Sequence, residues 1–439
     1  MNETRKNLGQ LFVPICLETL CYMLAGMIDT LMLSSVGDEA VGAVGTANTY
    51  ISIFIIMFSI ISTGVMAVMT QYIGAGRIGI AYQARQLGAA FNAIVGVLLS
   101  VLLFLFSDKV LAVIGIAEVL KEPAGVYMKI VGGACILNAL IPVFSGYLRA
   151  FGHTRYPMAA TIIGNVVNLV LNAVFLFVFH MGVAGVAVAT VISRVVNLSI
   201  VLVAAHFNVH AGEEKERIQN RKVFWQIVKV GLPSALETAL YNIAVTLIIR
   251  FLNQMDAEGI NVIARSYTVQ IANFSYCVGV SLAQANAIMV GWSLGAKEYE
   301  KCDKETGKAA VIGVATAIIM ALLLAVLSPW IMRLFTDDAA MIQLVQKLLF
   351  IDIILEVGRV INLVYGNALK TSGDAMFTTI LAFVFMFLCA VGGTYVFGIR
   401  LELLVVGAYI AMAMDECVRA VGMMIRWKQG RWRNKNLIA

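Results

Sequence analysis

The sequence predicts an all-α membrane protein in which twelve transmembrane helices form two parallel six-helix repeats, folded as two lobes around a central cavity. Two observations lead to this prediction. Apolar residues make up 60% of the chain and charged residues only 13%, which is more apolar surface than a soluble protein of 439 residues can bury. The pattern PxxLETxxY at residues 14–22 also returns at residues 233–241, so a helix that contains an acid is duplicated.

Apolar runs separated by charged breaks predict twelve spans, each long enough to cross a hydrocarbon core of about 30 Å. Because several of them exceed ~20 residues, we expect some helices to tilt, bend or protrude from the bilayer. The predicted spans are residues 8–35, 41–73, 83–106, 122–149, 156–180, 182–207, 223–253, 259–294, 305–327, 340–369, 375–397 and 402–427.

The loops between these spans alternate in charge. One set of loops holds 20 of the 32 lysines and arginines, whereas the opposite set holds only Lys109, Lys121, Arg333 and Arg400. Loops rich in basic residues stay in the cytoplasm, so both termini are expected there. We therefore expect a multi-pass protein of a bacterial-type plasma (inner) membrane. The net charge of +6 follows from these loops and needs no nucleic-acid partner.

One long charged connector divides the chain into halves of six helices. We predict an N-terminal lobe at residues 1–207, a charged cytoplasmic linker at 208–222, a C-terminal lobe at 223–427 and a basic cytoplasmic tail at 428–439. The repeat extends beyond its first motif, because Arg149-x-x-Gly152 matches Lys370-x-x-Gly373 at an offset of 221. Since six is an even number, both repeats enter the membrane in the same sense and are parallel.

Acids inside the predicted spans are the first candidates for function, because each costs roughly 2.5–3.5 kcal/mol on insertion scales. Glu18 and Asp29 lie eleven residues apart, so they share one helix face with Tyr22 between them. The second repeat keeps Glu237 and Tyr241 but loses the second acid. Glu18 and Glu237, in a duplicated motif at equivalent inner ends, indicate a symmetric packing or gating element.

Asp29 has two open interpretations. Removal from water favours the neutral or cation-bound form of a carboxylate, so Asp29 is a candidate to exchange H+ or Na+ as a lobe opens and closes. The alternative is an acid that pairs with backbone donors or faces water near the outer end of its helix. Asn168 and Asn172 lie one turn apart on the fifth span and present oxygen atoms that suit a small alkali cation, or else they join helices by hydrogen bonds.

Two clusters of charge lie in the second lobe. Their members are spaced three or four residues apart, as in ion pairs within one helix. The clusters are Asp352, Glu356 and Arg359 in one span, and Asp415, Glu416 and Arg419 in another. We favour a structural role for both, with the alternative that Glu356 and Arg359 line the cavity and relay protons or bind substrate.

With these residues in view, the chain resembles the multidrug and toxic compound extrusion (MATE) transporters over essentially its whole length. The resemblance rests on the order and spacing of several blocks. They are Asp29-Thr30 followed by Gly37, Gly74-Ala75-Gly76, the LRAFGHT run at 148–154, Asn168-x-x-Leu171-Asn172, the GVAG run at 182–185 with Ala189-Thr190, Gly231-Leu232-Pro233, and Gly291 with Gly295-Ala296.

The resemblance implies antiport of amphipathic organic cations, driven by H+ or Na+, with alternating access. It also implies that Asp29, Asn168, Asn172 and Thr190 bind the coupling ion. Two departures stand out: position 172 is Asn where many relatives have Asp, and the positions that align with acids of a sodium-coupled branch are Tyr241 and Arg359. Glu18, Tyr22, Glu237, Tyr241, Glu356 and Arg359 are the candidates for substrate binding or gating.

Two other classes of protein compete with this interpretation. A flippase for lipid-linked oligosaccharides has a similar architecture, but the basic residues here lie mainly in cytoplasmic loops rather than in a cavity. A polytopic membrane enzyme would need a clustered metal or nucleophile site, and the four histidines and seven cysteines are scattered. We therefore expect no enzyme activity and no cofactor beyond the coupling ion. We expect a monomer in the lipid bilayer.

Overall fold

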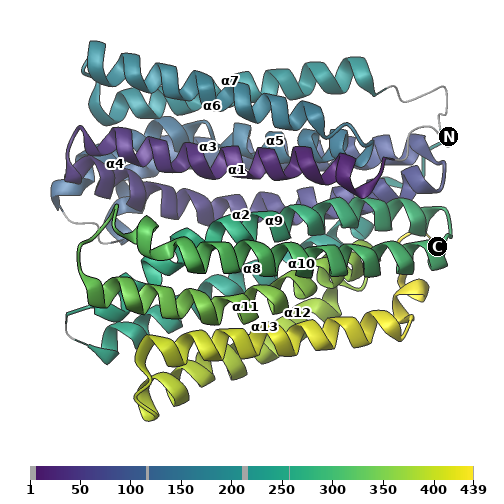
Figure 1. Ribbon diagram of the computed structural model, residues 1–439. Coiled ribbons are helices and arrows are strands. Elements are labelled where there is room, and N and C mark those ends of the chain that lie inside the picture. Colours follow the sequence, from purple (N-terminus) through teal and green to yellow (C-terminus); the bar gives the residue numbers. More distant parts are fainter. Residues whose placement is uncertain (1–5, 115–117, 210–215, 257, 439) are drawn as a thin grey trace. The chain divides into compact units, whose positions relative to one another are not determined.

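The computed structural model describes residues 6–114, 118–209, 216–256 and 258–438, and within these ranges all regular elements are helices (Figure 1). Nine elements of the first half form its six spans. They are α1 (Leu8–Ser34), α2 (Asp38–Gly74), α3 (Ile78–Ile114), α4 (Glu118–Tyr127) with η1 (Met128–Gly132) and α5 (Cys135–Ala150), α6 (Arg155–Ala173) with η2 (Val174–Val178), and α7 (Gly182–Asn208).

The second half repeats this arrangement. Its elements are α8 (Asn220–Met255), α9 (Ile260–Gly295), α10 (Tyr299–Met332), α11 (Ala339–Thr371), α12 (Ala375–Phe385) with η3 (Met386–Val391) and η4 (Thr394–Arg400), and α13 (Leu404–Lys428), followed by the short η5 (Arg431–Lys435). Each of the twelve predicted spans coincides with one of these helical segments, so the prediction of a twelve-helix, all-α chain is confirmed.

Length and composition alone identify fewer spans. In the described part of the chain, nine helices are long and apolar enough to cross a membrane, and the pair Glu118–Gly132 and Cys135–Ala150, bent by 44°, makes ten. The two remaining segments, α11 and α13, carry the charged clusters of the second half. Ion pairs within and between these two helices balance the charges, which lowers the cost of placing the helices in a membrane.

The chain divides into two compact units, Met1–Leu232 and Pro233–Ala439. In the first unit, α1 packs on α6, α6 on α7, and α3 on α2 and α5. Its core includes Ala43, Ala47, Phe58, Leu103 and Met128. Small residues allow the helices to approach closely, as where Gly96 lies against Ile136 of α5.

In the second unit, α9 is the central helix, packed against α10 and α11, while α11 also packs on α13. The most apolar stretch of α9 is 83% buried, compared with 22–44% in the other candidate spans. The core around it contains Leu348, Leu355 and Tyr409. This unit therefore surrounds α9 and α11 with protein and leaves α10 at its edge.

The boundary between the units falls inside α8, at Pro233. The first turns of α8 belong to the first unit, where a side chain at Gly231 would collide with the backbone of Ile60. The predicted linker at 208–222 lies partly in residues 210–215, outside the described residues, as do Arg5 and Lys215 of the predicted basic loops. The predicted lobe limits at 207 and 223 and the tail limits at 428 and 439 stay predictions.

Candidate functional site

Asp29 meets the two asparagines of α6 inside the first unit. The Nδ2 atom of Asn172 donates to Asp29 Oδ1 at 2.7 Å and lies 3.1 Å from Asn168 Oδ1. Asn168 and Asn172 are buried, whereas Asp29 is partly exposed. The Oδ1 atom of Asn172 is buried and has no hydrogen-bond partner among the described residues. One carboxylate and two amides thus form a polar cluster between α1 and α6.

The cluster can present several oxygen atoms to one cation. The orientation of an amide in a structure follows from its hydrogen bonds, and the opposite orientation exchanges its oxygen and nitrogen. If the Asn172 amide turns over, its oxygen faces Asp29 and Asn168. Three oxygen atoms that can act as ligands for one cation then lie close together. Hard oxygen ligands of this kind suit H+ or a small alkali cation.

Thr190 of α7 lies next to this cluster but uses its hydroxyl within its own helix, donating to the carbonyl oxygen of Val186 at 2.8 Å. Tyr127 connects it to the cluster. The Tyr127 hydroxyl is 3.2 Å from Asn48 Oδ1, and it interacts with Thr190 and, electrostatically, with Asp29. Thr190 therefore belongs to the surroundings of Asp29 but makes no direct contact that the structure shows.

Arg194 is the residue of this site that the sequence analysis missed. It lies one helical turn after Thr190 on α7 and interacts electrostatically with both Asp29 and Tyr127. Its Nη1 atom is buried and has no hydrogen-bond partner among the residues described. The signal was present in the sequence, because an arginine inside the apolar span 182–207 is as costly as an acid.

Glu18 and Glu237 make equivalent contacts in the two units. Arg149 Nη2 lies 2.6 Å from Glu18 Oε1, and Lys370 Nζ lies 2.9 Å from Glu237 Oε1. A threonine of the next span donates to each acid, Thr161 at 3.5 Å and Thr378 at 3.2 Å. In each unit, the glutamate of the repeated motif therefore pairs with a repeated basic residue of another helix.

The two tyrosines of the repeated motif lie on the surface. Tyr22 is 71% exposed and Tyr241 is 46% exposed. The structure does not bring Tyr22 into the cluster around Asp29. Tyr241 interacts electrostatically with Tyr276 and Arg359 in the second unit. Their proposed roles in substrate binding or gating stay predictions.

The two charged clusters of the second unit form one network. Arg359 of α11 forms ion pairs with Glu356 and, at 3.7 Å, with Glu416 of α13. Arg419 pairs with Glu416 at 2.9 Å and with Asp415 at 2.6 Å. Because an arginine bridges the helices, the network holds α11 against α13 as well as balancing charge.

Glu356 and Glu416 differ in how well this network satisfies them. Glu416 also accepts a hydrogen bond from Asn362 at 2.9 Å, so both of its oxygens have partners. Glu356 is fully buried, and its Oε2 atom has no partner in the described part of the chain. Its neighbour Ser275 is also buried. In the described part of the chain, this network with Asp352 contains four acids and two arginines, so acids are in excess.

Comparison with known proteins identifies the family to which this chain belongs. The family model MatE matches twice, at residues 14–174 and 233–396, once in each half of the chain. The chain belongs to the MatE family of transporters. The uncharacterized transporter YisQ of Bacillus subtilis is 32% identical over 97% of this chain and 94% of its own length. The probable multidrug resistance protein NorM of Thermotoga maritima is 25% identical over 99% of this chain and 95% of its own.

Solved MATE structures confirm the fold. A MATE crystal structure in the straight conformation superposes with a TM-score of 0.88 at 21% identity, covering 98% of this chain and 96% of the other. An outward-facing MATE transporter of the MOP superfamily gives a TM-score of 0.86 at 20% identity, with 98% and 96% covered. The arrangement of twelve helices in two lobes predicted from the sequence is that of this family.

Proposed function

We propose that this MatE protein exports amphipathic organic cations in exchange for H+ or Na+, and that Asp29 binds the coupling ion. The observation that carries the proposal is the polar cluster of Asp29, Asn168 and Asn172 between two helices of a unit with a largely apolar core. A carboxylate in such surroundings gains most from binding a cation, since its own charge is costly there.

The coupling would act on α1. With Asp29 loaded by a cation from outside, the Asn172 amide would turn its oxygen towards the ion, and the contact between α1 and α6 would change. Release of the ion into the cytoplasm would restore the hydrogen bond from Asn172. Alternating access follows if the two states of this contact favour opposite openings of the protein, as coupling between an ion and a conformation requires.

Arg194 affects how tightly Asp29 binds the coupling ion. Its positive charge interacts with Asp29, so the site without a coupling ion already holds one positive charge nearby. Binding of a second cation is therefore weakened compared with an isolated acid. This favours an ion that is driven in by a gradient and released readily, as antiport needs.

The relatives support an export role. Several are named as probable multidrug resistance proteins, and full-length coverage means that this chain has the same two halves as they do. Both termini are proposed to lie in the cytoplasm of a bacterial-type inner membrane, from the distribution of basic residues. The protein is proposed to act as a monomer.

The test is efflux of a fluorescent organic cation from proteoliposomes with an imposed pH or Na+ gradient. Wild type is expected to follow one gradient, and Asp29→Asn is expected to abolish this dependence without changing thermal unfolding. Asp108→Asn is the matched control, because Asp108 is an exposed acid of α3 that pairs with Lys129 at 2.9 Å. Full gradient-driven transport by Asp29→Asn would refute the role of Asp29, and absence of any organic-cation transport by wild type would refute the export function.

A further inference from the structure

Arg85 of α3 has no acidic partner among the described residues. Its guanidinium lies over three aromatic rings, with Cζ 4.1 Å from the ring centroid of Tyr82, 4.8 Å from that of Tyr147 and 5.6 Å from that of Phe144. No described residue accepts a hydrogen bond from it, and its Nε atom is buried without a partner. Rings stabilise the faces of a guanidinium but leave the N–H groups at its edges unsatisfied. Arg85 therefore retains donors that need an acceptor.

Tyr147 of α5 has a second unsatisfied group next to Arg85. Its side chain is fully buried, and its hydroxyl has no hydrogen-bond partner in the part of the chain that the structure describes. It also interacts electrostatically with Arg85. Edge-to-face contacts hold the ring in place, with centroids 6.5 Å from Tyr82 and 5.2 Å from Phe151. Because an unpaired buried polar group is costly, two of them in one place indicate that a further acceptor binds there.

Neither of the two helices supplies an acid that could neutralise Arg85. The half of α3 that contains Arg85 has no aspartate or glutamate, and α5 has none over its whole length. Two acids of the same unit, Glu18 and Glu216, are each paired with another arginine. A positive charge in partly apolar surroundings is stabilised more by an anion than by a neutral acceptor such as water. We therefore expect the acceptor at Arg85 to be an anion.

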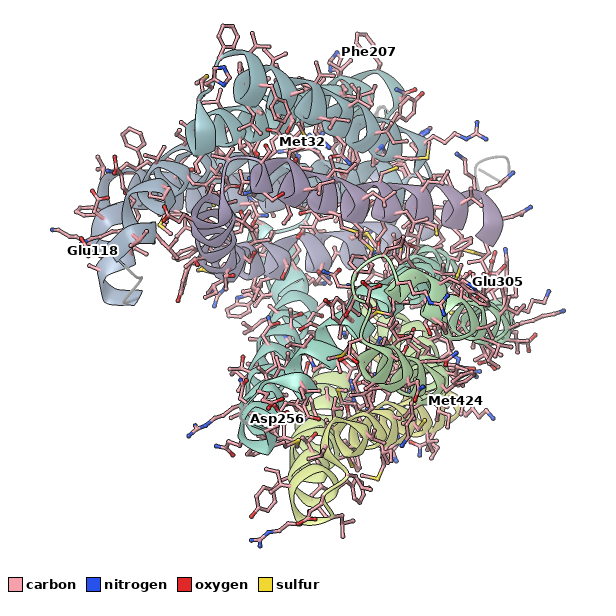
Figure 2. All side chains as sticks on the ribbon, turned by 60° about the vertical axis from the view of Figure 1, so that its left-hand side comes forward. Met32, Glu118, Phe207, Asp256, Glu305 and Met424 are labelled. Atoms are coloured by element: carbon pink, nitrogen blue, oxygen red, sulfur yellow. The ribbon has the colours of Figure 1, made fainter. Side chains whose placement is uncertain are left out.

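The position of Arg85 along α3 indicates the class of anion. Arg85 lies about 10 Å from the start of α3, at 1.5 Å per residue, and just inside the predicted span at 83–106. Tyr147 is equally close to the end of its own predicted span. This is the end of the unit at which α7 finishes near Phe207, opposite the end that carries Glu118 (Figure 2). Arginine and tyrosine at the end of a span lie at the depth of the phospholipid headgroups, where phosphate is the common anion.

We propose that Arg85 binds a phosphate group at this end of α3. The planar guanidinium can donate to two phosphate oxygens at once, and stacking on Tyr82 and Tyr147 fixes its orientation before the ligand arrives. The phosphate belongs either to a membrane phospholipid or to a phosphate ion in solution, since both present the same oxygens. Asp29 lies in the last third of α1, which runs in the same direction as α3, so this site is separate from the cluster around Asp29.

The first measurement is an NMR titration of the full-length protein, with its arginines labelled with nitrogen-15, in a maltoside detergent that contains no phosphate. The Nε–H signal of Arg85, identified by its loss in Arg85→Lys, is expected to shift when phosphatidylglycerol is added. Diacylglycerol has the same chains without the phosphate and is expected to leave this signal unchanged. Arg155, an exposed arginine at the same end of the unit, is the internal control, and its signal is expected to shift much less.

Native mass spectrometry then compares the affinity for phosphatidylglycerol. Arg85→Gln is expected to bind at least about tenfold more weakly than wild type, because hydrogen bonds from a charged group are lost, whereas Arg155→Gln is expected to bind like wild type. Inorganic phosphate separates the two sources: displacement of the lipid assigns the site to free phosphate, and no displacement assigns it to the phospholipid. An Arg85 signal that neither ligand shifts, or an equal loss of affinity in both variants, would overturn the proposal.

Discussion

Arg149 and Glu18 form an ion pair of 2.6 Å although 131 positions separate them in the chain. Lys370 and Glu237 form its counterpart in the second unit, at 2.9 Å. Both pairs are largely buried, with side chains between 12% and 20% exposed. The same ion pair is thus present in both repeats. It joins the first helix of each unit to its fourth span.

The first prediction concerns this repeated pair. Glu18→Ala and Arg149→Ala should each destabilise the protein by about 3 kcal/mol, because each change removes the counter-charge of a largely buried group. The double variant should be destabilised by less than the sum of the two changes. Thermal unfolding in detergent measures this cycle, and Glu237→Ala with Lys370→Ala repeats it in the second unit. Additive effects would show that the charges do not interact.

The second prediction separates the two asparagines of the Asp29 cluster. Asn172→Ala removes the donor to Asp29 and should reduce gradient-driven efflux at least tenfold, since a hydrogen bond to a charged group contributes about 1.5–3 kcal/mol. Asn168→Ala acts on Asp29 only through Asn172 and should have a smaller effect. The measurement is the initial rate of cation efflux in proteoliposomes. Equal losses in both variants would contradict this order of contacts.

The third prediction tests Arg194. Arg194→Gln removes the positive charge that interacts with Asp29, so the coupling cation should bind more tightly, by about tenfold if the interaction contributes 1.4 kcal/mol. The ion concentration that gives half-maximal efflux should fall accordingly. Arg194→Lys keeps the charge and serves as the control. An unchanged or weaker ion dependence in Arg194→Gln would show that Arg194 does not compete with the coupling ion.

Helix spans could be predicted from the sequence because they depend on local runs of apolar residues. Contacts between spans could not. Glu18 and Arg149 lie in separate repeated motifs, and their pairing depends on which helices are neighbours. Glu356 and Glu416 lie in separate clusters of the sequence, and the contact of Arg359 that joins these clusters crosses from α11 to α13. The proximity of Asp29 and Asn172 was expected only from the family resemblance.

The fourth prediction follows from the difference between the two glutamates of the second unit. Glu416→Gln should destabilise the protein by about 1.5–3 kcal/mol, since Arg359 and Arg419 each lose one charged partner and keep the other, Glu356 or Asp415. Glu356→Gln should be much milder, because four acids face two arginines there and one oxygen of Glu356 has no partner among the described residues. Thermal unfolding of the two variants measures the difference. A greater loss in Glu356→Gln would reverse the assigned order.

The last prediction concerns pH and the segment before α8. Arg77 binds Glu216 through a 2.7 Å contact, and this hydrogen bond and the charge of Arg77 hold the pKa of Glu216 below its ordinary value. A lowered pKa means that the contact is fully formed above about pH 4.3, the ordinary value for glutamate, and is lost as pH falls through the pKa in the folded protein. The nearby Ile218 amide donates to Gln83 and reports on the contact.

Hydrogen exchange at Ile218, corrected for intrinsic rates, should therefore become faster when the pH is lowered from 7 to below 4. Glu216→Gln removes the charge at every pH, so its exchange should already be faster at pH 7 and should change little on acidification. Gln83 still binds the segment through Ile218 and Asn220, which limits the effect to partial loosening. If Glu216→Gln exchanges like wild type at pH 7, the ion pair does not hold the segment, and Gln83 alone fixes it on the first unit.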